Sequence, residues 1–262
     1  MELGLKGKKA LVTGGGRGIG RAIALALAKE GARVSVFSRT GSDVRSLVRE
    51  MNRFGKGHYG VSLDLLSARA PSLLSRALKK NFGDPDIVVH NLGSTLEITD
   101  PFCPMSDWRR VLRCNLETAI ELDQHFVPPM QKKQWGRVVH IGSTSSMENN
   151  GPVTYCTAKA ALAAYSRSMG RVLAKDGIVM SAVLPGAVFT EGCYWDKAMK
   201  ERPEHVQKYL SDRCPLGRFG TPESIAAMVV FLCSELAGFC QGAIIPVDGG
   251  QSRHFFVEPG TY

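Results

Sequence analysis

The chain has 262 residues, a formal net charge of +9, 44% hydrophobic residues and 22% charged residues. This length and composition predict a single globular domain over 1–262, with enough apolar residues for a full core. No segment approaches the roughly 20 consecutive apolar residues that span a bilayer. The first nine residues contain no apolar run of signal-peptide length. We therefore expect a cytoplasmic protein with no membrane segment.

The basic residues are dispersed along the chain, and no nucleic-acid-binding motif accompanies them. We therefore expect no nucleic-acid partner. The positive charge indicates either a solvated surface or an acidic or phosphorylated partner. The seven cysteines show no C-x-x-C pair and no metal-ligand spacing. They are expected to be free thiols, and no metal site is predicted.

The chain opens with a strand, a glycine-rich loop, a helix and a second strand. The strand over 8–13 runs into Thr13-Gly14-Gly15-Gly16-Arg17-Gly18-Ile19-Gly20. The helix over 18–30 is rich in Ala and Leu and ends at Gly31, before the strand over 33–38. In this context the glycines let the backbone turn tightly and approach a pyrophosphate, which the helix N-terminus attracts. The spacing differs from the commoner G-x-G-x-x-G.

Strands and helices alternate along the rest of the chain. Further strands are predicted over 58–63, 86–90, 136–142, 178–184 and 243–247, and further helices over 42–53, 68–81, 106–126, 153–175 and 222–234. Such alternation predicts an α/β fold, a Rossmann-type doubly wound parallel sheet with helices on both faces. Ligands bind at the carboxyl ends of the strands in such sheets. One crevice can therefore collect the strand-end residues Thr13, Ser38, Asp64, Asn91, Ser143 and Pro185.

Tyr155 and Lys159 are four residues apart in the helix over 153–175, so they share one face. The ordinary pKa of a tyrosine, near ~10, is too high for proton exchange at neutral pH. Positive charge on Lys159 is expected to lower the pKa of the Tyr155 hydroxyl. A tyrosine tuned in this way can protonate a carbonyl oxygen or deprotonate an alcohol. The same spacing also occurs on solvated helix faces, so its meaning depends on the glycine loop.

Together, the T-G-x-x-x-G-x-G loop and the Y-x-x-x-K pair resemble the short-chain dehydrogenase/reductase family. Further matches follow in the family's order: Asn91-Leu92-Gly93, Asn115, Ile141-Gly142-Ser143, and Pro185-Gly186 with Thr190. The chain is most similar to reductases of the 3-oxoacyl-carrier-protein type. The resemblance implies an oxidoreductase that acts on C=O and CH–OH groups. It also implies a homotetramer formed through the helices over 106–126 and 153–175.

Charge at the end of the second strand indicates the cofactor. NAD-preferring members of the family have an acidic residue there, whereas this chain has Ser38 followed by Arg39, with Arg17 in the glycine loop. Two guanidinium groups can pair with a 2′-phosphate, so NADP(H) is predicted. The resemblance implies that it is bound by Thr13, Gly14, Gly16, Arg17, Gly18, Ile19, Gly20, Ser38, Arg39, Asp64, Leu65, Asn91, Gly93, Tyr155, Lys159, Pro185, Gly186, Val188 and Thr190.

The resemblance also implies catalytic roles for four residues. Tyr155 is expected to be the general acid, and Lys159 to lower its pKa and hold the nicotinamide ribose. Ser143 is expected to polarise the substrate carbonyl, and Asn115 to anchor a water relay from Lys159.

Two features depart from the family pattern. Tyr155 follows Ser143 by twelve residues, one fewer than is usual, and Ser145 and Ser146 are competitors for the serine's role. The strand that ends at Gly142-Ser143 favours Ser143. The other departure is His90-Asn91-Leu92-Gly93, where N-N-A-G is usual.

Substrate identity is the least determined feature. The segment 191–213 is expected to be a substrate lid. Its residues Tyr194, Trp195, Met199 and Tyr209 suit either an apolar or ring-shaped substrate or a subunit interface. The tail over 251–262, with Phe255 and Phe256, is expected to reach a neighbouring subunit. Gln134 and Asp176 occupy positions that resemble carrier-docking arginines, with Lys132, Lys133 and Lys175 adjacent.

Three hypotheses follow. The leading one is an NADPH-dependent reductase of a 3-oxoacyl thioester or a similar ketone, a small-molecule substrate that is free or carrier-bound. The second is an NADP-dependent sugar or polyol dehydrogenase, which Glu148 and Asn149 would suit. The third is a non-enzymatic NADP-binding interaction protein, against which the intact catalytic set argues.

Overall fold

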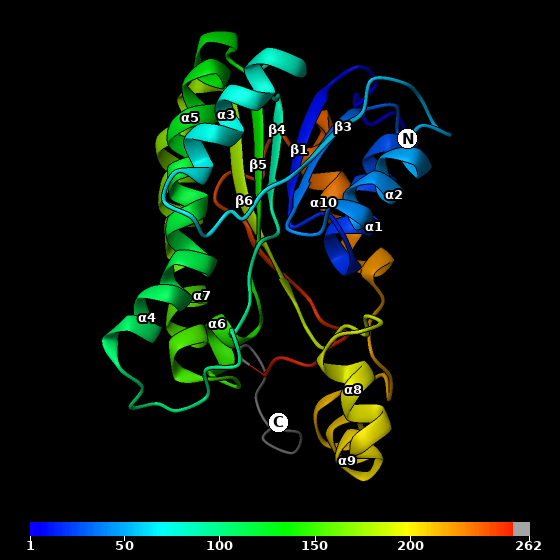
Figure 1. Cartoon of the computed structure of the whole chain (residues 1–262), viewed down its shortest axis with the longest axis vertical. Coiled ribbons are helices and arrows are strands. Elements are labelled where there is room, and N and C mark those ends of the chain that lie inside the picture. Colours follow the sequence, from blue (N-terminus) through cyan, green and yellow to red (C-terminus); the bar gives the residue numbers. More distant parts are fainter. Residues whose placement is uncertain (254–262) are drawn as a thin grey trace, which may run out of the picture.

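Seven parallel strands form one sheet in the order β3-β2-β1-β4-β5-β6-β7 (Figure 1). The computed structural model describes residues 1–253 of the chain. The strands are β1 (Lys9–Thr13), β2 (Arg33–Ser38), β3 (Tyr59–Ser62), β4 (Ile87–His90), β5 (Gly136–Ile141), β6 (Ile178–Pro185) and β7 (Ile244–Val247). Each lies within one residue of its predicted range. The predicted α/β doubly wound sheet is confirmed.

Helices pack on both faces of the sheet (Figure 1). One face carries α1 (Gly18–Lys29), α2 (Gly41–Met51) and α10 (Pro222–Cys233), and the other carries α3 (Ala70–Asn81), α5 (Thr118–Lys133) and α7 (Val153–Leu173). Because both faces are covered, strands such as β4 and β6 are apolar along almost their whole length. No helix within residues 1–253 is both long and apolar enough to cross a bilayer.

The predicted helix over 106–126 is the main difference from expectation. The structure has α4 (Met105–Leu112), a π-helical turn (Arg113–Glu117) and then α5, which continues through Pro128 and Pro129 to Lys133. Side chains donate hydrogen bonds to backbone carbonyl groups at this π-helical turn. Asn115 Nδ2 donates to Val111 O at 2.9 Å, and Thr118 Oγ1 donates to Arg113 O at 2.8 Å. Such turns are frequent at functional sites.

Three helices were not predicted: α6 (Ser145–Glu148), α8 (Tyr194–Glu201) and α9 (Pro203–Arg213). The last two form the segment that was expected to be a lid, and they lie beyond the carboxyl ends of the strands (Figure 1). The expected tail over 251–262 lies outside the described residues from position 254 onward, so Phe255 and Phe256 are not placed.

The strand order opens a crevice at one edge of the sheet. From β1 the chain proceeds outward to β2 and β3, and then returns to place β4 on the other side of β1. The connections after β1 and β4 therefore diverge, and ligands of such sheets bind above the carboxyl ends of two strands in this arrangement. This topological switch point lies beside the glycine loop.

Close packing of α7 on the turn before β7 gives a stability prediction. A methyl group at Gly170 would lie 2.6 Å from Gly242 Cα and 2.8 Å from Met180 O, all of them backbone contacts. We expect Gly170→Ala to lower the free energy of unfolding by about 1–3 kcal/mol, although alanine favours the helix. Urea denaturation measures this. Gly55→Ala, where the nearest atom is 4.0 Å away, is the matched control, and equal stability of both variants would contradict the packing.

Candidate active site

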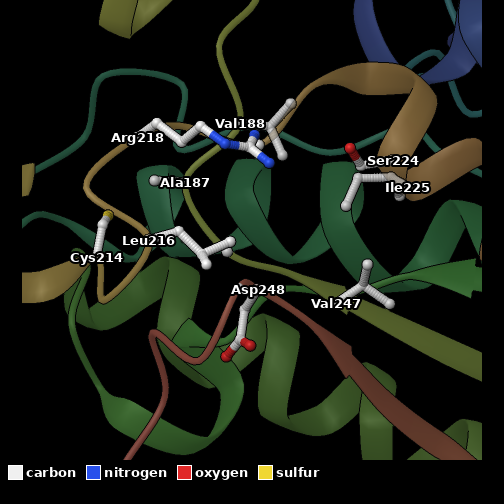
Figure 2. A pocket seen from close by; sticks show the side chains of 12 residues that line it. Ala187, Val188, Cys214, Leu216, Arg218, Ser224, Ile225, Val247 and Asp248 are labelled. Carbon is white, nitrogen blue, oxygen red and sulfur yellow. The ribbon is translucent and has the colours of Figure 1, made fainter.

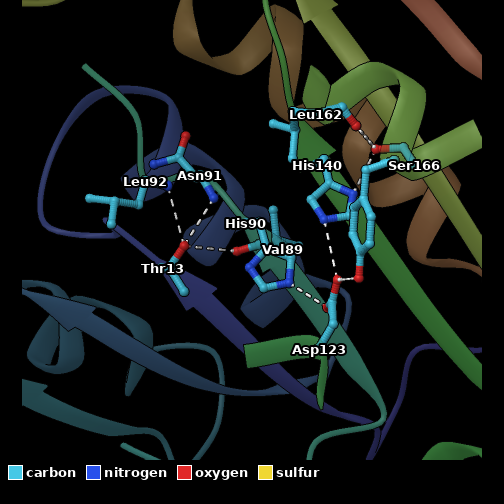
Figure 3. A network of polar contacts seen from close by, with 10 residues as sticks. Thr13, Val89, His90, Asn91, Leu92, Asp123, His140, Leu162 and Ser166 are labelled. Atoms are coloured by element: carbon cyan, nitrogen blue, oxygen red, sulfur yellow. Dashed lines mark hydrogen bonds and ion pairs between the residues drawn. The ribbon is translucent and has the colours of Figure 1, made fainter. Parts of the chain in front are cut away.

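The glycine loop is held against the end of β4 by hydrogen bonds. Asn91 Nδ2 donates to Gly14 O at 3.1 Å. The Asn91 and Leu92 backbone amides donate to Thr13 Oγ1 at 3.0 and 3.2 Å (Figure 3). A methyl group at Gly20 would lie 2.5 Å from Gly14 O. Gly14 and Gly18 have φ values of 63° and 54°, which favour glycine. The loop therefore has room for backbone but not for side chains.

The end of β2 lies directly beside this loop. A methyl group at Gly16 would lie 2.7 Å from Ser38 Oγ. Arg17 and Arg39 are both exposed, and neither forms a salt bridge within residues 1–253. Two guanidinium groups are thus available to bind an anion near the end of β2. An acidic residue at this position would repel the anion.

Asp64 and Leu65 follow the end of β3 and lie near the start of α5. Asp64 Oδ1 accepts a hydrogen bond from the Leu66 amide at 3.1 Å, which forms a local turn. Leu65 is buried, and its carbonyl lies 3.4 Å from Thr118 Oγ1, whose one hydrogen is donated to Arg113 O. The turn at the end of β3 therefore lies beside the start of α5.

Ser143 and Tyr155 are in contact in spite of their short spacing. A hydrogen bond from the Ser143 side chain acts to lower the pKa of Tyr155, and Ser143 Oγ accepts from the Ser145 amide at 3.1 Å. The two competing serines bond elsewhere: Ser145 Oγ donates to Asn150 Oδ1 at 2.7 Å, and Ser146 Oγ donates to Ser143 O at 2.7 Å. Among the three serines, Ser143 is therefore the one joined to the tyrosine.

Lys159 is buried, with 2% of its surface exposed, and its ammonium group donates to the Ile141 carbonyl at 2.7 Å. Burial lowers the pKa of Lys159 to about 8. Burial also raises the pKa of Tyr155 to about 12, although a hydrogen bond from Ser143 acts to lower this pKa. The expected lowering of the tyrosine pKa by Lys159 is thus absent from this geometry. The reason is that desolvation of the phenolate outweighs the other influences.

Gly93 brings Lys159 and Asn115 together. A methyl group at Gly93 would lie 2.8 Å from Lys159 Nζ and 2.9 Å from Asn115 Oδ1. Asn115 is held on both sides by Ser94, whose amide donates to Oδ1 at 3.1 Å and whose carbonyl accepts from Nδ2 at 2.7 Å. Residue 93 must therefore be a glycine for these two polar groups to approach each other.

The loop after β6 completes the crevice. A methyl group at Gly18 would lie 2.9 Å from Thr190 Cγ2, so Thr190 lies over the start of α1. The Ala187 amide donates to Gln251 Oε1 at 2.8 Å, and Val188 bridges to Gly220. Gln251 was not predicted as a site residue. No local sequence pattern marks it, because its partners are far away in the chain.

Behind this loop lies a small pocket of about 90 Å³, shown in Figure 2. It lies between the loop after β6, the lid end and the start of α10, and is lined by Gly186, Val188, Leu216, Arg218, Ser224 and Asp248, among others. Ser143, Tyr155 and Lys159 do not line it. The pocket therefore adjoins the backbone of the Pro185-Gly186 loop but is separate from Ser143, Tyr155 and Lys159.

The lid aromatics pack mainly on one another. The Trp195 ring lies 4.9 Å from Tyr194, 4.4 Å from Tyr209 and 4.8 Å from Phe219, measured between ring centroids. Gln251 Nε2 donates to the Tyr209 hydroxyl at 2.7 Å, so one side chain joins the lid to the loop after β6. These ring contacts form a small aromatic core within the lid. Packing within the lid therefore accounts for much of the aromatic surface of this segment.

The buried ammonium group gives a second prediction. At pH 7 Lys159 is protonated in both folded and unfolded chains, and the fall of its pKa from 10.5 to about 8 represents a folding cost of about 3 kcal/mol. Lys159→Met removes this cost but also loses the hydrogen bond to the Ile141 carbonyl. We therefore expect a net rise of about 2 kcal/mol in the free energy of unfolding at pH 7.

The sign of the pH dependence follows from proton binding. Between pH 8 and 10.5 the unfolded chain binds more protons at Lys159 than the folded protein does, so the wild type gains stability as the pH rises. The difference in the free energy of unfolding between Lys159→Met and the wild type, measured by urea denaturation, should therefore shrink across this range. Exposed Lys79→Met is the control, and a gap that stays constant with pH would exclude this explanation.

Comparisons with known proteins agree with this geometry. The profile of the family described as enoyl-(acyl carrier protein) reductase matches residues 14–252. A 3-oxoacyl-[acyl-carrier-protein] reductase of Aquifex aeolicus is 37% identical over 252 residues, which cover 95% of this chain and 99% of the relative.

Two solved structures are similar over nearly their whole length. L-sorbose reductase from Gluconobacter frateurii, complexed with NADPH and L-sorbose, has a TM-score of 0.90 and 28% identity, covering 98% of this chain and 100% of that one. A 3-oxoacyl (acyl-carrier-protein) reductase from Agrobacterium tumefaciens with NADP bound has a TM-score of 0.87 and 31% identity, covering 94% and 95%. Together with the glycine loop and the Tyr155–Lys159 pair, these matches show that the chain belongs to the short-chain dehydrogenase/reductase family.

Proposed function

We propose that this chain is an NADPH-dependent reductase that transfers hydride to a ketone, with a 3-oxoacyl thioester as its substrate. The observation that carries the proposal is the convergence of Ser143, Tyr155 and Lys159 at the carboxyl edge of the sheet, beside the glycine loop. The similarity to 3-oxoacyl-[acyl-carrier-protein] reductases over 95% of the chain supports the thioester as substrate.

The residues present fit a phosphorylated nicotinamide dinucleotide. Gly16 and Gly20 leave no room for side chains, as close approach to a pyrophosphate requires. The exposed Arg17 and Arg39 can pair with a 2′-phosphate, and Thr190 lies over the start of α1, where the nicotinamide end would be held. When bound, the cofactor supplies the hydride.

The protein's own residues supply the proton and position the carbonyl. Ser143 orients the substrate oxygen toward the Tyr155 hydroxyl, to which it is already bonded. Tyr155 then donates its proton to that oxygen as the alcohol forms. The Lys159 ammonium lies 5.7 Å from the centroid of the Tyr155 ring, and its position is held by the Ile141 carbonyl. Asn115 fixes the loop at Ser94 beside Lys159. A path near Gly93 is thereby left along which the proton that Tyr155 donates can be replaced.

A second candidate is an NADP-dependent sugar or polyol dehydrogenase. The TM-score of 0.90 to L-sorbose reductase favours it. Glu148, however, is engaged by the Arg253 backbone amide at 2.8 Å, so its carboxylate is partly satisfied within the protein. Asn149 remains exposed at the end of α6 and offers an amide to a hydroxylated substrate.

Assembly and location complete the proposal. We propose a homotetramer that uses α4, α5 and α7, since Met105 on α4 and both Val153 and Val172 on α7 expose large apolar side chains. We also propose a cytoplasmic location, which the seven unpaired cysteines support. Lys132, Lys133 and Lys175 lie near the amino ends of β5 and β6, the edge opposite Tyr155. They therefore lend no support to carrier docking at the crevice of the same subunit.

Removal of the Tyr155 hydroxyl tests the reaction. We expect purified wild-type protein to oxidise NADPH in the presence of a short 3-oxoacyl thioester, and Tyr155→Phe to lower kcat by about 10²–10⁴-fold because the proton donor is lost. Absorbance at the NADPH band measures the rate. Tyr59→Phe, which removes a hydroxyl bonded to Asn81 away from the crevice, is the control. Turnover of ketoses or polyols, with none of the thioester, would favour the second candidate instead.

Cofactor preference tests the two arginines. We expect the double substitution Arg17→Ser and Arg39→Ser to lower kcat/KM for NADPH by about 30-fold or more, because charge-assisted bonds to the 2′-phosphate are lost. The value for NADH should change little, since NADH lacks that phosphate. Arg76→Ser on α3 is the control. A wild type that prefers NADH would refute the argument from charge.

A further inference from the structure

The segment that follows β7 places one amide side chain in the interior. Gln251 is 8% exposed and lies in a turn that Asp248 bonds from within. Asp248 Oδ1 accepts from the Gly250 amide at 3.0 Å, and Asp248 Oδ2 accepts from the Ser252 amide at 2.8 Å. Asp248 also lines the small pocket beside the loop after β6 (Figure 2). The turn is therefore held without the Gln251 side chain, and the proposed catalytic steps do not use that side chain either.

The Gln251 amide joins two segments that are far apart in the sequence. Its Oε1 accepts from the Ala187 amide, in the loop after β6, at 2.8 Å. Its Nε2 donates to the Tyr209 hydroxyl, in α9, at 2.7 Å. Both are short for bonds of an N–H group to oxygen. A methyl group at Gly186 would lie 2.7 Å from Gln251 Oε1, so a side chain at residue 186 would displace this amide oxygen.

The two partners fix the orientation of the Gln251 amide. A backbone N–H group can only donate, so the amide atom that faces Ala187 is the oxygen. The amide nitrogen therefore faces Tyr209 and donates to the phenol oxygen. Burial raises the pKa of Tyr209, whereas the hydrogen bond from Gln251 acts to lower this pKa. An amide satisfies both partners at once, and an apolar side chain of similar size would satisfy neither.

Ala187 belongs to the loop that is proposed to hold the nicotinamide end of the cofactor. It directly precedes Val188, and Thr190 of the same loop lies over the start of α1. The Gly220 amide donates to Ala187 O at 2.9 Å. Ala187 is thus held twice, through its carbonyl by Gly220 and through its amide by Gln251.

Tyr209 belongs to the aromatic core of the lid. Its ring centroid lies 4.4 Å from that of Trp195, so it contacts the other lid helix, α8. A second bond reaches the lid from the same end of the chain, because Arg253 Nη2 donates to Asp212 O. That bond is 3.3 Å long and exposed, whereas the bond of Gln251 to Tyr209 is 2.7 Å long and partly buried. Gln251 is therefore the firmer of these two attachments.

We propose that Gln251 is a positioning residue: its side-chain amide attaches Tyr209 of the lid to Ala187 of the loop after β6, so that the lid and the nicotinamide loop keep one relative position around the ketone. A buried amide is unfavourable unless both its polar atoms are bonded, and here each bond goes to one wall of the substrate side. The inference rests on the proposed function for its effect on turnover, but the attachment itself is tested without turnover.

Trypsin cleavage of the lid measures the attachment in the protein without cofactor. The lid carries exposed side chains that trypsin recognises, at Lys197, Lys200 and Lys208. We expect Gln251→Leu to speed cleavage within 191–213 about fivefold, because a hydrogen bond that holds the lid is lost. Tyr209→Phe removes the same bond but keeps the ring, and it should speed cleavage by a similar factor.

Ligand binding separates the two bonds of Gln251. Gln251→Leu loses both, so we expect the NADPH Kd, measured by NADPH fluorescence, to rise about fivefold. Tyr209→Phe keeps the bond to Ala187, so its NADPH Kd should stay within about twofold of wild type. KM for the ketone should rise about fivefold in both variants with kcat within about twofold, because the lid is loosened while Ser143, Tyr155 and Lys159 are untouched.

Gln241→Leu is the matched control, since its amide donates to Gly238 O at 2.9 Å before β7 begins, at the opposite edge of the sheet. It should change neither cleavage nor binding. Wild-type cleavage and NADPH Kd in Gln251→Leu overturn the proposal. If that variant does not fold, wild-type cleavage and ketone KM in Tyr209→Phe overturn it. A wild type that reduces no ketone refutes the proposed function alone, because cleavage and NADPH binding need no turnover.

Discussion

Lys159 has 2% of its surface exposed, and its ammonium group donates a hydrogen bond to one backbone carbonyl, that of Ile141. Keeping a cation in this position requires that the surrounding backbone be fixed and that no other atoms intrude. Gly93 satisfies the second requirement, because any side chain there would overlap both Lys159 and Asn115. The π-helical turn satisfies the same need on the helix side, since it turns Asn115 toward Ser94. Gly93, Asn115 and the Ile141 carbonyl are arranged around this one buried charge.

The two faces of the sheet differ in how they support the crevice. Beneath α1, α2 and α10 the core is apolar, and it carries the glycine loop, whose task is to present backbone to a ligand. Beneath α5 and α7 the apolar core is interrupted by the polar cluster of His90, Asp123 and His140. Apolar packing is tolerant of small shifts, whereas a hydrogen-bonded carboxylate fixes direction as well as distance. The directional contacts occur on the face that carries α7, the helix of Tyr155 and Lys159.

The lid is built differently from the rest of the molecule. Its helices α8 and α9 are short and bury few residues, so Trp195 and its aromatic neighbours stabilise them in place of a core. Gln251 then bonds both Tyr209 and the Ala187 amide, and Arg253 bonds Glu148. The last described residues thus connect the lid, the loop after β6 and helix α6. These segments are therefore held together by a few long-range contacts.

The sequence by itself determined the sheet, its helices and most of the crevice, because these follow from local rules. Alternating apolar strands and helices specify a parallel sheet, and parallel strands bring Thr13, Ser38, Asn91 and Ser143 to one edge whatever else happens. Only the tertiary structure decided the π-helical turn at Asn115, the contact of Ser143 with Tyr155, the Ile141 carbonyl under Lys159 and the meeting of His90 with Asp123. Each of these depends on atoms from segments brought together by packing, and burial changes the chemistry of a side chain in ways that spacing does not express. The tyrosine illustrates this, since four-residue spacing predicted a lowered pKa for Tyr155 and desolvation raised it.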